Sequence, residues 1–242
     1  FPNMINIYKP LNIFSLPYLF DDFNSASRAF NGPTAQKIYQ DFENSTGLKI
    51  LAVYNGGVRG LTTGNKAVKS VEDLKGLKIR TPGTPVLIRT MEELGANAVS
   101  ISGNEIFTSL QQGTVDGQDS SITWAYDQGY YEIQKHLVLT NHGYTGTCFV
   151  INAQYFNSLP DNIKTALTEA AKEAAAYTDG FCEMYDMAVV DKYVSKGLDV
   201  TVLDVEKVRP LVQKVWEEFA NDVGGMDTIQ ALIEDGKKNT KY

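Results

Sequence analysis

The chain has 242 residues, of which 43% are hydrophobic and 21% charged, a balance typical of a folded globular protein rather than a disordered one. The formal net charge is -7 and no block of lysine or arginine occurs, which argues against binding to nucleic acid or to acidic membrane surfaces. No apolar run approaches the roughly eighteen residues of a membrane span, and the start Phe1-Pro2-Asn3 has neither an initiator Met nor a signal-peptide pattern. We therefore expect a soluble chain whose beginning is processed or cut.

Strand-like and helix-like segments alternate along most of the chain, which predicts an α/β protein with a largely parallel sheet. A near-continuous apolar run predicts a buried strand over 48–54. Alternation of apolar and polar residues predicts a short strand over 77–81, which ends at Pro82-Gly83. The next expected elements in chain order are helix 85–94, strand 98–101 and helix 105–112.

Residues 158–196 interrupt this alternation and predict one long helix. Ser158-Leu159-Pro160-Asp161 fits a capping box, apolar residues recur at helical spacing, and Gly197 ends the pattern, with Gly180 as its weak point. At 1.5 Å per residue the helix would be roughly 55 Å long, against about 30 Å for a small domain. It should therefore cross two lobes; a coiled coil is the alternative, without a heptad charge pattern to support it. Strand 200–203 and a helix from 204 to about 221 follow.

Sequence motifs for catalysis and metal binding are missing. His136 and His142 lack a second histidine at helical ligand spacing and a nearby cysteine, and no G-x-S-x-G, G-x-x-x-x-G-K or G-x-G-x-x-G occurs. Asp116-Gly117-Gln118-Asp119 lacks the spacing of a calcium loop and is predicted to be a turn. Cys148 and Cys182 favour two separately buried thiols, although a single disulfide stays open. We expect no metal and no cofactor.

Arginine is scarce, with five residues against seventeen lysines, and two arginines lie beside strand-like runs. Arg80 stands near the carboxyl end of the 77–81 strand, where ligands bind in open α/β sheets, and a guanidinium there is a bidentate partner for a carboxylate. Arg59 lies in "NGGVRGLTT". For Arg59 a surface salt bridge and ligand binding are equally open.

Six segments in order, "FSLPYLF", "VEDLKGLKIRTPG", "ELGANAVSIS", "EIFTSLQQGTVDGQD", "YYEIQKHLVLTNHGY" and "SLPDNIKTALTEAAKEAA", resemble the solute-binding subunit of TRAP transporters, the DctP-type family. The resemblance implies a two-lobed periplasmic-binding-protein-like fold of type II, with a long helix crossing both lobes. It assigns 1–57 and 146–185 to lobe I, and 58–145 and 186–242 to lobe II, with the ligand cleft between them. Family members begin with further βα units, roughly 60–70 residues, so lobe I is expected to be incomplete at its N-terminus.

The resemblance also implies the site. Arg80 matches the arginine that binds the ligand carboxylate in the family. Where members commonly read "DGQENP" this chain reads "DGQDSS", so that Ser120 replaces a ligand-contacting asparagine. The expected roles are a second carboxylate or hydroxyl contact for Arg59, hydroxyl contacts for Thr84, Ser120 and Thr147, and apolar walls for Trp124 and Tyr144.

The resemblance therefore implies a periplasmic receptor, not an enzyme, that captures a small organic acid and passes it to TRAP membrane subunits. A sugar acid or hydroxy acid is the expected ligand, with a C4-dicarboxylate as the alternative within the family. An enzyme on a two-lobed α/β scaffold is the rival from another class, since fold does not settle function. The identity of the acid and the oligomeric state stay open.

Overall fold

The computed structural model describes residue 1 and residues 4–238, so the outermost residues of the expected lobes, 2–3 and 239–242, lie outside the described part. The strands are β1 (Leu48–Thr63), β2 (Lys78–Thr81), β3 (Asn97–Ser100), β4 (Gly117–Ser121), β5 (His136–Leu139), β6 (Tyr144–Asn152) and β7 (Asp199–Val202). The α-helices are α1 (Phe23–Asn31), α2 (Pro33–Thr46), α3 (Pro85–Glu93), α4 (Ile106–Gln111), α5 (Ile122–Asp127), α6 (Ala153–Ser158), α7 (Asp161–Ser195), α8 (Val205–Phe219) and α9 (Met226–Lys237). Short 3-10 helices are η1 (Lys9–Ser15), η2 (Val71–Leu74), η3 (Gly103–Glu105), η4 (Tyr130–Glu132) and η5 (Ala220–Val223).

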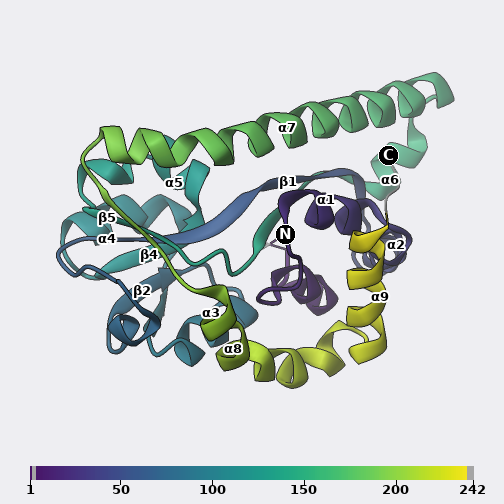
Figure 1. Cartoon of the computed structure of the whole chain (residues 1–242). Coiled ribbons are helices and arrows are strands. Elements are labelled where there is room, and N and C mark those ends of the chain that lie inside the picture. The colour runs from purple at the N-terminus through teal and green to yellow at the C-terminus, as the bar shows by residue number, and fades with distance from the viewer. Residues whose placement is uncertain (2–3, 239–242) are drawn as a thin grey trace.

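Strand β1 is the axis of the fold. Within the described residues the strands form one connected sheet in the order β3-β2-β4-β1-β5-β7, with β6 also paired to β1. From Leu48 to Val58 the strand pairs with β6, and from Arg59 onward it pairs with β4 and β5. It therefore runs through both lobes (Figure 1). The change of partner lies one residue beyond the expected lobe boundary between residues 57 and 58.

The expectation of a largely parallel sheet is wrong. β2 pairs in parallel with β3 and β4, and β5 pairs in parallel with β7, but β1 is antiparallel to β4, β5 and β6. The difference arises because β1 continues beyond the expected end at Tyr54 to Thr63, and its direction is opposite to that of β4, β5 and β6. The α/β class with two lobes is confirmed.

One continuous helix, α7, covers the expected long segment, and Figure 1 shows it along the top of the molecule over both lobes. Its 35 residues correspond to about 52 Å at 1.5 Å per residue. The predicted capping box is not formed, because the helix begins after Pro160 and the Ser158 hydroxyl donates to the carbonyl oxygen of Tyr155 at 2.7 Å. A single helix is therefore confirmed, without the predicted cap.

The two C-terminal helices pack on different parts of the chain. Helix α8 follows β7 and packs on α3 of lobe II, and α9 packs on α1 and α2 (Figure 1). The backbone amide of Thr34 donates to Asp235 Oδ2 at 2.9 Å, and Arg28 Nε donates to the carbonyl oxygen of Gly236 at 2.7 Å. These contacts join α9 to α1 and α2, which the resemblance assigns to lobe I, although it assigns 186–242 to lobe II.

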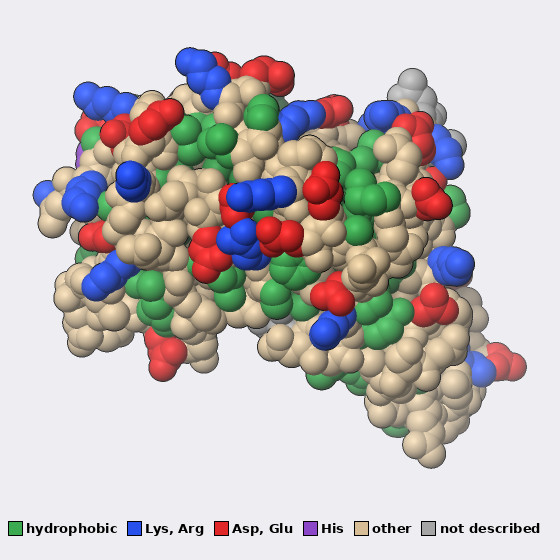
Figure 2. Space-filling model, turned by 90° about the horizontal axis from the view of Figure 1, so that it is seen from below, with side chains coloured by type: hydrophobic (Ala, Val, Ile, Leu, Met, Phe, Trp, Pro, Cys, Tyr) green, Lys and Arg blue, Asp and Glu red, His purple; other side chains and the backbone are tan. Residues whose placement is uncertain are grey.

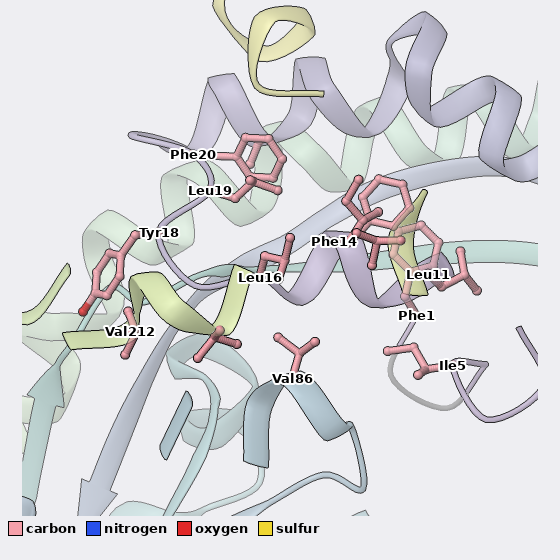
Figure 3. Packing of buried hydrophobic residues seen from close by; sticks show 14 of the residues in the cluster. Phe1, Ile5, Leu11, Phe14, Leu16, Tyr18, Leu19, Phe20, Val86 and Val212 are labelled. Carbon is pink, nitrogen blue, oxygen red and sulfur yellow. The ribbon is translucent and has the colours of Figure 1, made fainter. Parts of the chain in front are cut away.

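A large apolar cluster joins the segment before α1 to helices of both lobes (Figure 3). Leu11, Phe14 and Leu16 are buried in it together with Val86 of α3 and Val212 of α8. Each such side chain contributes roughly 1.5–3 kcal/mol when fully buried. On the face seen from below, basic and acidic side chains are interspersed and no patch of one sign forms (Figure 2).

Candidate functional site

Arg80 is a buried cation near the carboxyl end of β2, with 5% of its surface exposed. Its Nε donates to the carbonyl oxygen of Ile101 at 2.9 Å, and its Nη1 donates to the carbonyl oxygen of Asp119 at 3.3 Å. No carboxylate lies within ion-pair distance of Arg80 among the residues that the structure describes. Burial lowers the pKa of Arg80 to about 10, against the opposing charge of Asp119. The side chain is protonated at neutral pH and carries a charge that no neighbouring acid neutralises.

Arg59, by contrast, has its own counter-ion. Its Nη2 lies 2.7 Å from Asp119 Oδ2, and its Nε donates to Asp119 Oδ1 at 3.1 Å. The Nη1 of Arg59 donates to the hydroxyl of Thr145 at 3.4 Å. The pair is almost completely buried, and this two-bond geometry is the strong form of the arginine–carboxylate contact. Of the two alternatives left open, the structure therefore contains a salt bridge, but a buried one.

His142 completes this arrangement around Asp119. Its Nε2 lies 3.2 Å from Asp119 Oδ1, and its Nδ1 lies 2.7 Å from the hydroxyl of Thr140. Burial alone would raise the pKa of the Asp119 carboxyl, but the charges of Arg59 and then His142 outweigh it and hold the pKa well below its usual range. Asp119 is therefore ionised, and its charge is balanced by Arg59.

The predicted turn over 116–119 is wrong, because residues from Gly117 onward form β4 between β1 and β2. A Cβ atom on Gly117 would lie 2.4 Å from the carbonyl oxygen of Thr62, so only glycine permits this close pairing. As a result Asp119 lies between the two arginines, each of which also approaches its carbonyl oxygen. The sequence analysis missed Asp119, His142 and the Ile101 carbonyl. No local signal marks Asp119, because only the insertion of β4 between two strands buries this acid and requires a cationic partner for it.

Three other expected residues lie on β4 or at the helices that follow β2 and β4. The hydroxyl of Thr84, the N-terminal cap position of α3, is buried and has no hydrogen-bond partner. Ser120 follows Asp119 on β4, and its hydroxyl donates to the carbonyl oxygen of Ser121 at 3.2 Å. Trp124 of α5 is 37% exposed and lies edge-on to Tyr130, with ring centroids 5.7 Å apart.

Tyr130 is a residue of this region that the sequence analysis also missed. It is 1% exposed and its ring contacts those of Trp124 and Phe107. Burial raises the pKa of Tyr130 to about 12, and the positive charge of Arg80 opposes the shift. Its hydroxyl therefore stays protonated and lies within the electrostatic field of Arg80.

The last two expected residues lie on β6. Thr147 is half-buried and pairs with Tyr54 of β1. Tyr144 pairs with Val58, the residue before Arg59, and lines a cavity of about 460 Å³, here called the hinge cavity. Its main charged or polar lining residues are Asp21, Asp22, Tyr144, Glu183, Asp186 and Arg209. Four carboxylates against one arginine make this cavity unsuitable for an acid. A second cavity, of about 580 Å³ between 64–66 and 110–113, also lies away from both site arginines.

No group of three histidine, cysteine or acidic side chains in the described part of the chain could hold a metal ion. Cys148 on β6 and Cys182 on α7 are both free thiols. None of the described helices combines the length and apolar character needed to cross a bilayer. The charged chemistry of the site consists of the two arginines, Asp119 and His142.

Residues 1–222 match the profile of DctP, described as bacterial extracellular solute-binding protein, family 7. The chain is 30% identical over 236 residues to the 2,3-diketo-L-gulonate-binding periplasmic protein YiaO of Escherichia coli, covering 96% of this chain and 71% of that protein. The sugar acid binding protein DctPAm of Advenella mimigardefordensis, in complex with galactonate, gives a TM-score of 0.91 at 26% identity, covering 98% of this chain and 77% of that one. A TRAP periplasmic solute binding protein of Sulfitobacter with bound α-D-taluronate gives a TM-score of 0.89 at 26% identity, and the match covers 96% of this chain and 75% of that one.

Proposed function

Because the chain belongs to the DctP family, family 7 of the bacterial extracellular solute-binding proteins, we propose that it captures a small organic acid outside the cytoplasm, in the periplasm, and delivers it to the membrane subunits of a TRAP-type transporter. The observation that carries the proposal is the state of Arg80. It is buried, charged and without a carboxylate partner among the described residues, and a buried charge of this kind is costly unless a ligand pairs with it. A ligand carboxylate supplies that partner.

A sugar acid or hydroxy acid is the ligand that fits best. The proposed contacts pair the carboxylate with Arg80 and the ligand hydroxyls with Thr84, Ser120 and Thr147, beside the ring of Trp124. The hydroxyls of Thr84 and Ser120 can each donate and accept. The similar proteins named above bind 2,3-diketo-L-gulonate, galactonate and α-D-taluronate, all of which are polyoxygenated acids with one carboxylate.

The C4-dicarboxylate alternative needs a second cation for the second carboxylate. Arg59 is the candidate, but its Nε and Nη2 are already bound to Asp119. A dicarboxylate would have to compete with that buried pair or use Nη1 alone. The proposal therefore ranks acids with one carboxylate above succinate, with Arg59 contributing mainly the position of Asp119.

The proposed action is capture without reaction. The two lobes close on the acid by hinge motion, and the closed form is the one handed to the membrane subunits. The positions around Arg80 offer carboxylate and hydroxyl recognition, and we assign no nucleophile or general base to them. An enzyme at the same site would convert the acid, which separates the two functions experimentally.

Native mass spectrometry of the purified protein tests the proposal, because a tightly held acid is carried through purification. We expect a complex with one polyoxygenated acid, which is released unchanged after prolonged incubation. Calorimetric titration with galactonate, α-D-taluronate, 2,3-diketo-L-gulonate and succinate then ranks the ligands. Recovery of a chemically altered acid would favour the enzyme, and absence of binding by any acid would refute the receptor.

A further inference from the structure

Strand β1 has an irregularity at the point where it passes from one lobe to the other. Its pairing with β6 shifts register between Asn55 and Val58, across Gly56 and Gly57. Gly57 has a φ of +100°, which side-chain-bearing residues rarely adopt. Immediately afterwards Arg59 begins the pairing with β4. The geometry of this bulge therefore decides where the Arg59 side chain is presented.

Two aspartates of α7 bind the backbone at either side of the bulge. Asp179 Oδ1 accepts a hydrogen bond from the backbone amide of Asn55 at 2.6 Å, and Asp186 Oδ2 accepts one from the amide of Val58 at 2.7 Å. The two acids are seven residues, or about two helical turns, apart and so share one face of α7. A Cβ atom on Gly57 would lie 2.8 Å from Asp186 Oδ1, so glycine is required for this approach.

Neither aspartate forms an ion pair in the part of the chain that the structure describes. Asp186 Oδ1 is buried and has no hydrogen-bond partner. Burial raises the pKa of Asp186 to about 6, and the hydrogen bond from Val58 opposes the shift. The titratable and charged groups around it are Asp21, Asp22, Tyr144, Cys182, Glu183 and Arg209. The only cation in this set, Arg209, lies 3.3 Å from Asp21.

The C-terminal half of α7 is bound to lobe II. The hydroxyl of Tyr193 donates to the carbonyl oxygen of Ile122 at 2.8 Å, and the hydroxyl of Tyr185 donates to Asp127 Oδ1 at 2.9 Å. Ile122 and Asp127 belong to α5, which directly follows the strand that carries Asp119. Movement of α7 is therefore shared with α5 and, through Asp186, with the backbone beside Arg59.

We propose that Asp179 and Asp186 are positioning residues for ligand binding: they join α7 to the β1 bulge and thereby hold Arg59 and Asp119 in the geometry that leaves Arg80 free for the acid. This inference rests on the proposed function. Asp186 acts through Val58, the residue before Arg59. The backbone amide of Arg59 itself donates to the carbonyl oxygen of Gly143 at 2.8 Å. The carboxylate accepts more strongly than the neutral acid, so the contact weakens when Asp186 is protonated.

The test compares Asp186→Ala with Asp186→Asn, which keeps an acceptor oxygen at the same place. The matched control is Asp191→Ala, at an exposed aspartate of the same helix. Hydrogen exchange measures protection of the Val58 amide, and titration with galactonate, α-D-taluronate, 2,3-diketo-L-gulonate and succinate measures affinity. A hydrogen bond to a charged group is equivalent to roughly 10- to 150-fold in an equilibrium constant.

We expect Asp186→Ala to speed Val58 exchange by about tenfold or more and to weaken acid binding by about tenfold, while the control changes neither. Asp186→Asn should retain most of the affinity. We also expect the wild type to lose affinity for the acid as the pH falls from about 7.5 to 5, and Asp186→Asn not to show this loss. If the wild type binds an acid, and Asp186→Ala has the same affinity and the same Val58 exchange rate as the wild type, this inference is overturned while the proposed function stands. Absence of acid binding by the wild type refutes the proposed function, and with it this role of the aspartates.

Discussion

Replacing Arg80 with alanine removes the one site cation that has no acid partner among the described residues. If the guanidinium holds the ligand carboxylate by two parallel bonds, the variant leaves a buried carboxylate unpaired. Breaking such a pair typically costs about 3–5 kcal/mol, or roughly two to four orders of magnitude in affinity. Arg80→Lys should recover only part of this loss, because an ammonium keeps the charge but not the planar fork.

The stability of the unliganded protein, unlike its affinity for the acid, should change little. Burial lowers the pKa of Arg80 from 12.5 to about 10. Below about pH 10 Arg80 is charged in both states, and its charge is less favourable in the folded protein than in the unfolded chain. At about 1.4 kcal/mol per pKa unit this cost is of the order of 3 kcal/mol, offset in Arg80→Ala by lost packing. We expect the melting temperature of Arg80→Ala to stay within a few degrees of the wild type.

Arg59→Ala is the matched control, because it leaves Asp119 buried without its partner and should destabilise the fold by about 3–5 kcal/mol. Calorimetric titration and thermal melting of the variants separate binding from stability. Our reasoning fails if Arg80→Ala binds the native acid within about threefold of the wild type, a change of less than 1 kcal/mol. It also fails if Arg80→Ala lowers the melting temperature as much as Arg59→Ala does.

Ser120→Asn should change the ranking of acids in titrations more than it changes thermal stability, because an amide reaches further than a hydroxyl; an unchanged ranking would show that Ser120 does not face the ligand. Gly57→Ala should lower the free energy of unfolding by more than about 1 kcal/mol, because the φ of Gly57 is +100° and the added Cβ would lie only 2.8 Å from Asp186 Oδ1. Gly180→Ala adds a Cβ with nothing within 4 Å inside a helix and should raise the free energy of unfolding by up to about 1 kcal/mol. Denaturant unfolding measures both changes. Equal effects of the two glycine changes would contradict this. Folding raises the pKa of Asp186 from 3.8 to about 6, so the wild type loses stability as the pH rises through this window. Asp186→Asn avoids this loss and should therefore be more stable than the wild type by up to about 3 kcal/mol at pH 7.5. Below pH 3.8 the two proteins should be equally stable, and equal unfolding curves at pH 7.5 would refute the prediction.

The elements that depend on local signals are predictable from the sequence. The spacing of apolar residues is enough to predict α7 as one helix, and the alternation before Pro82 predicts β2 with Arg80 near its end. The continuity of β1 from the apolar run over 48–54 into the strand-like run around Arg59 was not predicted, because the apolar run ends at Asn55-Gly56-Gly57. The strand persists through the bulge because α7 supplies acceptors for two of its amides. That support comes from residues more than 120 positions away and leaves no local pattern.

The candidate site likewise contains one residue that local sequence signals identify and others that only the fold brings together. Arg80 was identified from its place in a strand, whereas the pairing of Arg59 with Asp119 joins residues 60 positions apart that β4 and β1 bring together. A short polar stretch with two acids resembles a turn, and only its insertion between two strands makes it buried. Tyr144 illustrates a second difficulty. The family resemblance implies that it is an apolar wall of the ligand site, whereas its side chain lines the hinge cavity together with four carboxylates.

The attachment of α9 to α1 and α2 affects how the chain reaches its native state. The bonds from Arg28 to Gly236 and from Thr34 to Asp235 span 208 and 201 positions. At roughly 5–20 residues per second, about 10–40 seconds of synthesis separate the two partners of each bond. During that interval the apolar faces of α1 and α2 have no native cover from α9. The parallel pair β2–β3 and helix α3 lie within a short stretch and can form earlier, whereas the faces of α1 and α2 that await α9 are exposed to chaperones and proteases for longer.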